Sequence, residues 1–212
     1  MLKCIFSVVL LFIIPTITFA EEFIAGKDYV LVKNADPVHS PANKVVVTEY
    51  FSYGCPWCYR LESELNRWVD AQGKTISYNK VPVIFNKDWE YYAKAYYTAK
   101  ALDLSAQLSP ALFNAILKEK QSLNNDKAMV DFFANHGVDA KVASSAFLHS
   151  PSIDIEINDS KRQMAHYQIA AVPALVVNND YKTDLQMAKS EERLFAILDF
   201  LVKKTAADNA QR

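Results

Sequence analysis

The stretch Lys44–Arg60, KVVVTEYFSYGCPWCYR, leads from a buried-strand pattern directly into a pair of cysteines, Cys55 and Cys58. Its first ten residues are β-branched and aromatic with few polar positions, which predicts a central strand covered on both faces. From Pro56 the apolar residues recur at helical spacing until Gly73 offers a stop. The stretch therefore predicts a strand that runs into C-x-x-C at the start of a helix.

The N-terminus has the regions of a secretory signal peptide. Lys3 supplies the positive charge, Cys4–Ile14 is an apolar run too short to span a bilayer, and Thr18–Ala20 supplies small residues for cleavage after Ala20. We therefore expect residues 1–20 to be removed, and Cys4 with them. A retained membrane anchor is the less favoured alternative.

The remaining chain of about 190 residues keeps two cysteines, and stability is a poor reason for keeping them. A chain of this length buries a sufficient core without staples, and linking cysteines so close in sequence removes little loop entropy. Removing Lys3 changes 23 basic against 24 acidic residues to 22 against 24, a net charge of −2. This balance predicts binding neither to nucleic acid nor to an anionic membrane surface.

The rest of the chain has the pattern of an α/β protein with a helical insertion. Residues 76–85, 174–177 and 181–183 have strand patterns, and Pro82 favours an edge or the end of the first of them. Residues 89–149 contain only helical signals. The order is strand, helix, strand, helical block, strand pair and terminal helix, which predicts a small mixed sheet with an inserted helical subdomain.

Two further elements are expected between and after these strands. Residues 152–158, SIDIEIN, alternate like a strand, although isoleucines four residues apart would also stack along a helix. Periodicity alone favours the strand. The last helix is predicted to begin after Ser190 as its cap, with Lys203 and Lys204 in its last turn, where they match the helix dipole.

The placement of Cys55 at a helix start predicts redox chemistry. Unpaired backbone N–H groups and the helix dipole favour a thiolate there, and Pro56 suits the first helical position because it has no N–H to leave unpaired. Cys58, one turn further in, is expected to be more buried and to attack a mixed disulfide formed at Cys55. A static disulfide is a weaker alternative. A zinc site is weaker still, because it normally needs four ligands and no second metal-binding spacing occurs among His39, His136, His149 and His166.

The segments EYFSYGCPWCYRLE (residues 49–62) and AAVPALVV (residues 170–177) together resemble the DsbA thiol:disulfide oxidoreductases of the bacterial periplasm. The resemblance covers essentially the whole chain after the signal peptide. It implies a thioredoxin fold with an inserted helical subdomain. The thioredoxin-like domain would then comprise residues 21–86 and 166–212, and the helical domain residues 87–165. The resemblance also places SIDIEIN in a long helix, and we follow it over the alternation.

The same resemblance implies a function. The protein would be a monomeric periplasmic oxidase that introduces disulfide bonds into unfolded exported proteins through a redox-active Cys55–Cys58 disulfide, with no metal or other cofactor. A DsbB-type, quinone-linked oxidase of the inner membrane would reoxidise it. Two alternatives stay open at this point: a disulfide isomerase or reductase on the same fold, and a peptide-binding, chaperone-like module with a static disulfide.

Further site residues follow from the resemblance. Val172-Pro173 matches the family's cis-proline dipeptide beside the cysteines, where Val172 would pair with an extended substrate. A valine before this proline looks like the oxidases.

Tuning of the thiols is expected from residues around the cysteine pair. Glu49 stands mid-strand, where a buried charge is costly without a partner. It matches a buried acid of the family, Glu62 matches a second acid, and Lys80 is a candidate partner for Glu49. Between the cysteines, Pro56 belongs to the family pattern, whereas Trp57 departs from the histidine that is common there. The reduction potential of this protein therefore does not follow from that of its relatives.

Overall fold

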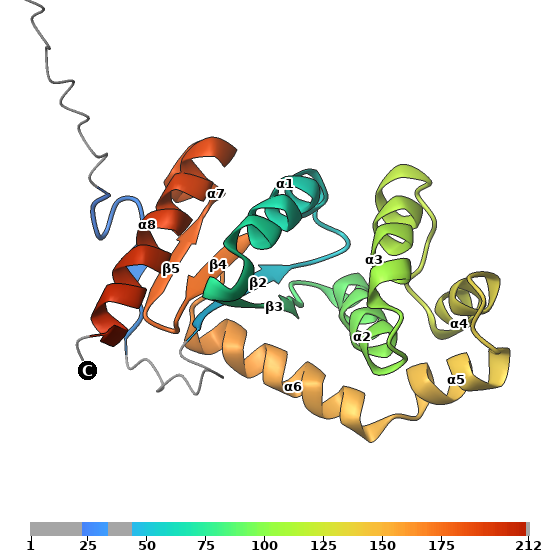
Figure 1. Cartoon of the computed structure of the whole chain (residues 1–212). Helices are drawn as coiled ribbons and strands as arrows, with labels where there is room; N and C mark the ends of the chain where they lie inside the picture. Colours follow the sequence, from blue (N-terminus) through green and yellow to red (C-terminus); the bar gives the residue numbers. More distant parts are fainter. Residues whose placement is uncertain (1–22, 34–43, 211–212) are drawn as a thin grey trace, which may run out of the picture.

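A computed structural model describes residues 23–33 and 44–210 (Figure 1). The predicted signal peptide and His39 lie outside the described residues. A mixed five-stranded sheet has the order β1-β5-β4-β2-β3, in which β2 and β3 are parallel and the other neighbouring pairs are antiparallel. The strands are β1 (Val30–Leu31), β2 (Val45–Phe51), β3 (Ile76–Pro82), β4 (Ala174–Val177) and β5 (Tyr181–Asp184).

Eight α-helices accompany this sheet in the described part of the chain. They are α1 (Pro56–Gln72), α2 (Lys87–Ala101), α3 (Ser105–Phe113), α4 (Asp126–Asn135), α5 (Ala140–Leu148), α6 (Pro151–His166), α7 (Leu185–Ala188) and α8 (Glu191–Ala210). A short π-helical segment, Asn114–Lys118, continues α3. Among these residues, none of the helices combines the length and the apolar character that crossing a bilayer requires.

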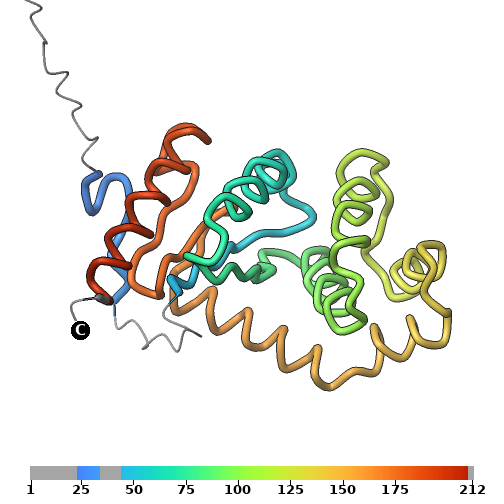
Figure 2. Tube along the Cα trace, in the orientation of Figure 1, coloured from blue at the N-terminus to red at the C-terminus, as the bar shows by residue number. Residues whose placement is uncertain are grey.

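The helices cover both faces of the sheet and extend beyond one of its edges (Figures 1 and 2). Leucines and isoleucines of α1 and α8 pack on one face, and the C-terminal end of α6 with the segment after it packs on the other. The block α2–α5 lies beside the β3 edge and has a core of its own, which also takes in Phe51 and Tyr53. The sheet therefore has a small helical subdomain attached at one edge.

Strand β2 is the central strand that its composition predicts. Val45 and Val47 pack under α1 and α8, whereas Tyr50 packs on the opposite face. Because side chains alternate along a strand, Glu49 shares the α1 face with the two valines. Strand β3 ends at Pro82 and forms the edge of the sheet, so the prediction for Pro82 is confirmed.

The region from 152 to 158 is helical, as the family resemblance implies and the alternation does not. Helix α6 begins with Pro151 at its first position. Ile153 and Ile157 are buried, whereas Ile155 is 61% exposed. The strand pattern was wrong because the buried pair is four residues apart, which places both side chains on one face of a helix.

The end of α8 and two short elements differ from expectation. Ser190 caps α8 by accepting a hydrogen bond from the Arg193 N–H at 3.1 Å, as predicted. The helix continues to Ala210, however, so Lys203 and Lys204 lie in its interior and their assignment to the last turn was wrong. The two-residue strand β1 and the one-turn helix α7 were not predicted, because such short elements carry no periodicity. The domain division at residues 87 and 165 stays a prediction.

Candidate active site

Cys55 is the N-cap residue of α1, in the turn that follows β2. Its sulfur accepts a hydrogen bond from the Cys58 N–H at 3.1 Å, and Pro56 occupies the first helical position. Both cysteines are in the thiol form. Cys55 is 4% exposed and Cys58 is fully buried, so the predicted order of burial is confirmed.

The two thiols differ in acidity as well as in exposure. Hydrogen bonds from the Cys58 side chain, and from the backbone N–H groups of Cys58 and Trp57, lower the pKa of Cys55 although burial opposes them. Burial in turn raises the pKa of Cys58 well above its ordinary value, and the neighbouring Cys55 raises it further. The pair therefore contains one sulfur that is readily ionised and one that holds its proton.

The loop before β4 brings a third segment to the cysteines. The Val172–Pro173 peptide bond is cis, as predicted. The Cys55 thiol donates a hydrogen bond to the Val172 carbonyl oxygen at 3.5 Å. Pro173 is buried, whereas Val172 is only partly covered. The backbone edge of Val172 thus lies directly beside the more acidic sulfur.

A groove of about 540 Å³ opens next to this loop. The Trp57 side chain, 56% exposed, forms part of its wall. The Arg60 guanidinium lies over the Trp57 ring, 5.4 Å from the ring centroid, and Arg60 Nε is 2.6 Å from Glu191 Oε1 at the start of α8. The groove is further lined by Ala171, Val172, Pro173, Leu185 and Gln186.

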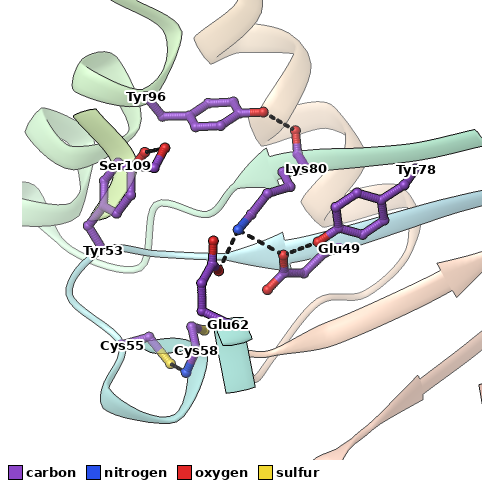
Figure 3. A network of polar contacts seen from close by, with 9 residues as sticks. All are labelled: Glu49, Tyr53, Cys55, Cys58, Glu62, Tyr78, Lys80, Tyr96 and Ser109. Atoms are coloured by element: carbon purple, nitrogen blue, oxygen red, sulfur yellow. Dashed lines mark hydrogen bonds and ion pairs between the residues drawn. The ribbon is translucent and has the colours of Figure 1, made fainter. Parts of the chain in front are cut away.

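A partly buried ionic cluster lies on the sheet beneath α1 (Figure 3). Glu49 and Lys80 are register partners on β2 and β3, with Lys80 Nζ 3.2 Å from Glu49 Oε2. Lys80 Nζ is also 2.7 Å from Glu62 Oε2 on α1. The Tyr78 hydroxyl donates to Glu49 Oε2 at 2.5 Å. The predicted contact between Lys80 and Glu49 is confirmed, and Glu62 joins it from the helix that carries the cysteines.

The charges in this cluster compensate only in part, since two carboxylates face one ammonium group. Burial raises the pKa of Glu49, the positive charge of Lys80 opposes that rise, and the negative charge of Glu62 adds to it. Burial disfavours the charged form of Lys80, yet the charges of Glu49 and Glu62 outweigh it and raise the Lys80 pKa. The negative charge of Glu49 also acts on both sulfurs: it opposes the lowering of the Cys55 pKa and adds to the rise of the Cys58 pKa.

Two residues near the cysteines, Tyr78 and Trp89, were not predicted from the sequence as part of the site. Tyr78 lies two positions before Lys80, so strand alternation places both side chains on one face, and this signal would have identified it. The indole of Trp89 packs against Gly54, so closely that a Cβ atom at Gly54 would collide with the indole nitrogen. No local pattern links these two residues, which come together only through the docking of α2.

None of the residues that the structure describes forms a group of three or more metal-binding side chains. The histidines predicted to lack a metal-binding spacing, His136, His149 and His166, belong to that described part.

The arrangement of two thiols at a helix start, beside a cis-proline loop, has clear counterparts. A family model described as a DSBA-like thioredoxin domain matches residues 46–201. The chain belongs to this family. The DsbA-like fold also agrees with a crystal structure of Pseudomonas aeruginosa DsbA, which has a TM-score of 0.83, 30% sequence identity, and a match over 90% of this chain and 97% of that one. The predicted α/β thioredoxin fold is confirmed.

Curated relatives carry the same name. A thiol:disulfide interchange protein DsbA from Burkholderia cepacia is 41% identical over 180 residues, which are 85% of this chain and 84% of the relative. Its namesake from Pseudomonas aeruginosa is 31% identical over 188 residues, 89% of this chain and 88% of the relative. This DsbA-like protein is a thiol:disulfide oxidoreductase that introduces disulfide bonds, and the alternatives of a static disulfide and of an isomerase find no support in these matches.

Proposed function

We propose that this DsbA-like protein acts in the periplasm on unfolded exported proteins, with Cys55 as the sulfur that exchanges with substrate and Cys58 as its buried partner. The difference between the two thiols supports these roles. Cys55 accepts backbone and side-chain hydrogen bonds at the start of α1 and has a lowered pKa, whereas Cys58 is fully buried and has a raised one. A low thiol pKa favours departure of that sulfur as a leaving group.

The exchange proceeds in two balanced steps from the oxidised pair. A substrate thiolate attacks Cys55 Sγ, the Cys55–Cys58 bond breaks, and the Cys58 sulfur leaves as a thiolate that takes up one proton. A second substrate thiolate then attacks the substrate sulfur of the mixed disulfide, and Cys55 leaves as a thiolate. Two electrons pass from the two substrate thiols to the cysteine pair, and the substrate gains one disulfide bond.

Val172 and Pro173 are proposed to hold the substrate segment during these steps. The Val172 backbone lies beside Cys55 and outside the ladder of β4, which begins at Ala174. An extended peptide can pair with such an edge by main-chain hydrogen bonds and place its side chains in an adjacent groove. The groove beside Trp57 lies in the right position for this role.

Redox tuning is assigned to the residues around the sulfurs. Pro56 starts α1 and keeps the following N–H groups directed at Cys55. Trp57 contributes its backbone N–H to the Cys55 sulfur, while its side chain adds no titratable charge. Glu49 exchanges a proton with Cys58, and Lys80 with Glu62 limits the electrostatic cost of the Glu49 carboxylate.

The working context follows from the family and the N-terminal sequence. Residues 1–20 would direct export, and the protein would act as a monomer. Its redox-active disulfide would need no metal or other cofactor. A DsbB-type, quinone-linked oxidase of the inner membrane would accept the two electrons and restore the Cys55–Cys58 disulfide.

Trapping of mixed disulfides tests the roles of the two cysteines. Cys58→Ala should accumulate disulfide-linked complexes with exported proteins, seen on non-reducing gels, because Cys58 is no longer present to attack the mixed disulfide at Cys55 and release the substrate. Cys55→Ala should trap none, because Cys58 is buried. Complexes in equal amounts with both variants would show that the assignment is wrong.

A further inference from the structure

The two oxygens of the Glu49 carboxyl group have different surroundings. Oε2 accepts a hydrogen bond from the Tyr78 hydroxyl at 2.5 Å and forms an ion pair with Lys80 Nζ at 3.2 Å. Oε1 is buried and has no hydrogen-bond partner within residues 23–33 and 44–210. Figure 3 shows Oε1 directed away from Tyr78, on the side of the view where Glu62 and Cys58 lie. The carboxyl group is therefore bound on one oxygen only.

The geometry of the sheet produces this asymmetry. Val47 and Glu49 of β2 are opposite Tyr78 and Lys80 of β3 in parallel register. Lys80 lies nearer to Glu62, at 2.7 Å, than to Glu49. Tyr78 is consequently the closer of the two donors on Oε2, and without its hydroxyl this oxygen would keep only the longer contact with Lys80.

Donors on Oε2 restrict where a proton can reside. A carboxylate oxygen has two lone pairs, and on Oε2 the Tyr78 hydroxyl and the Lys80 ammonium group, which has no acceptor site, each occupy one of them. We propose that Tyr78 is a positioning residue that keeps the exchangeable proton of Glu49 on Oε1, the oxygen on the side of Cys58. This inference rests on the proposed role of Glu49 as the proton partner of Cys58.

The proton then follows a defined route. When substrate attacks Cys55 and the disulfide breaks, the Cys58 thiolate takes the proton from Oε1, and Glu49 becomes a carboxylate. Tyr78 stabilises the negative charge that results, because hydrogen bonds to a charged acceptor are stronger than neutral ones. On reoxidation, the Cys58 proton returns to Oε1.

The groups that face Glu49 are consistent with this role. From β3 come Tyr78 and Lys80, from α1 come Glu62 and Cys58, with Cys55 at the N-cap of that helix, and the register partner on β4 is the apolar Leu175. The Tyr78 hydrogen bond lowers the pKa of Glu49 and so opposes the effects of burial and of Glu62. The hydroxyl of Tyr78 thus affects both where the proton resides on Glu49 and how tightly the carboxyl group holds it.

Tyr78→Phe tests the proposal while the aromatic ring is kept. The readout is the infrared C=O stretch of protonated Glu49 in the complete, oxidised protein, where Glu49 holds the proton, and it is identified as the band that Glu49→Gln removes. With the proton on Oε1, Oε2 is the carbonyl oxygen and receives the Tyr78 hydrogen bond. Tyr78→Phe should therefore move the band to higher frequency, raise the pKa of Glu49 and slow the first exchange step.

Tyr96→Phe is the matched control. Its hydroxyl is on the neighbouring helix α2 and donates to the Lys80 backbone carbonyl at 3.1 Å, not to Glu49. This variant should leave the band in place. Incorporation of 3-fluorotyrosine at position 78, an almost isosteric and stronger donor, should shift the band to lower frequency and confirm that the hydroxyl is responsible.

The outcomes separate this inference from the proposed function. An unchanged band in Tyr78→Phe, or a lower pKa of Glu49, would overturn the role of Tyr78. A band shift in Tyr78→Phe combined with unchanged exchange rates in Glu49→Gln would leave the proton on Oε1 but refute Glu49 as the partner of Cys58. A band shift in Tyr78→Phe and a slower exchange in Glu49→Gln, with no band shift in Tyr96→Phe, support the whole route.

Discussion

Cys55 and Val172, 117 positions apart in the chain, are joined by a hydrogen bond of 3.5 Å from the thiol to the backbone carbonyl oxygen. The same sulfur accepts the Cys58 N–H at 3.1 Å. A thiol can make both contacts, whereas a thiolate has no proton to donate and keeps only the second. Ionisation of Cys55 therefore releases the Val172 carbonyl at the position where substrate is proposed to pair.

The acidity of Cys55 should depend on the side chain at position 58. A hydrogen bond from that side chain is the largest cause of the lowered Cys55 pKa. We expect thiolate absorbance titrations to give a pKa below the ordinary 9.0 in the reduced protein, and a higher value in Cys58→Ala than in Cys58→Ser, since serine keeps a donor. Both variants retain the backbone N–H, so equal pKa values would show that the side chain has no part in it.

Trp57→His should make the protein more oxidising. The backbone N–H of residue 57 reaches the sulfur whatever the side chain is, so the substitution changes only the indole. Histidine adds an N–H donor or a positive charge that stabilises the thiolate. Each unit of pKa, about 1.4 kcal/mol, corresponds to roughly 30 mV for a two-electron couple. Equilibration with glutathione buffers measures the potential, and a value that stays or falls would contradict the argument.

Arg60→Ala should weaken the binding of peptide substrates. Arg60 links the exposed Trp57 ring to Glu191 across the groove. Without it we expect a KM that is higher by a few fold, since an exposed cation–π contact contributes about 0.5–1 kcal/mol, together with an unchanged reduction potential. Arg67→Ala is the control, because Arg67 pairs with Glu64 on the same helix and does not line the groove. Equal effects of both variants on KM would contradict the role of Arg60.

Gly54→Ala should destabilise the protein through Trp89. The added Cβ atom would collide with the indole nitrogen, and the indole is itself stacked on Phe85. Overpacking of this kind costs about 1–3 kcal/mol of unfolding free energy. In a Trp89→Leu background the cost should be smaller, and a double-mutant cycle from urea unfolding measures the difference. Strictly additive effects would show that the collision is not the cause.

Glu49→Gln should change how stability depends on pH. Burial raises the pKa of Glu49 above its ordinary 4.5, so between these two pKa values the folded protein holds a proton that the unfolded chain has lost. The stabilisation is complete below 4.5 and is lost as the pH rises through the folded pKa, by up to about 1.4 kcal/mol per unit. Unfolding free energies of Glu49→Gln should lack this fall. If the unfolding free energies of the wild-type protein and of Glu49→Gln changed in parallel with pH, burial would not raise the pKa of Glu49.

Local sequence was sufficient for much of the fold and for the cysteine pair. Periodicity located β2 and α1, and Pro56 with Gly73 marked the ends of that helix, because capping and alternation depend on neighbours within one turn. The same reasoning failed for residues 152–158, where a short run satisfies both a strand and a helix pattern. There only packing distinguishes the two, since it buries Ile153 and Ile157 together.

The chemistry around the sulfurs required the packed chain. Val172 meets Cys55 because β4 runs antiparallel to β2 in one specific register, and the Tyr78 hydroxyl reaches Glu49 because β3 runs parallel to it in another. Glu62 joins this group through the packing of α1 on the sheet. Strand register and helix docking are set by burial over the whole core, so residues distant in sequence acquire their distances, and their pKa values, only when that core has formed.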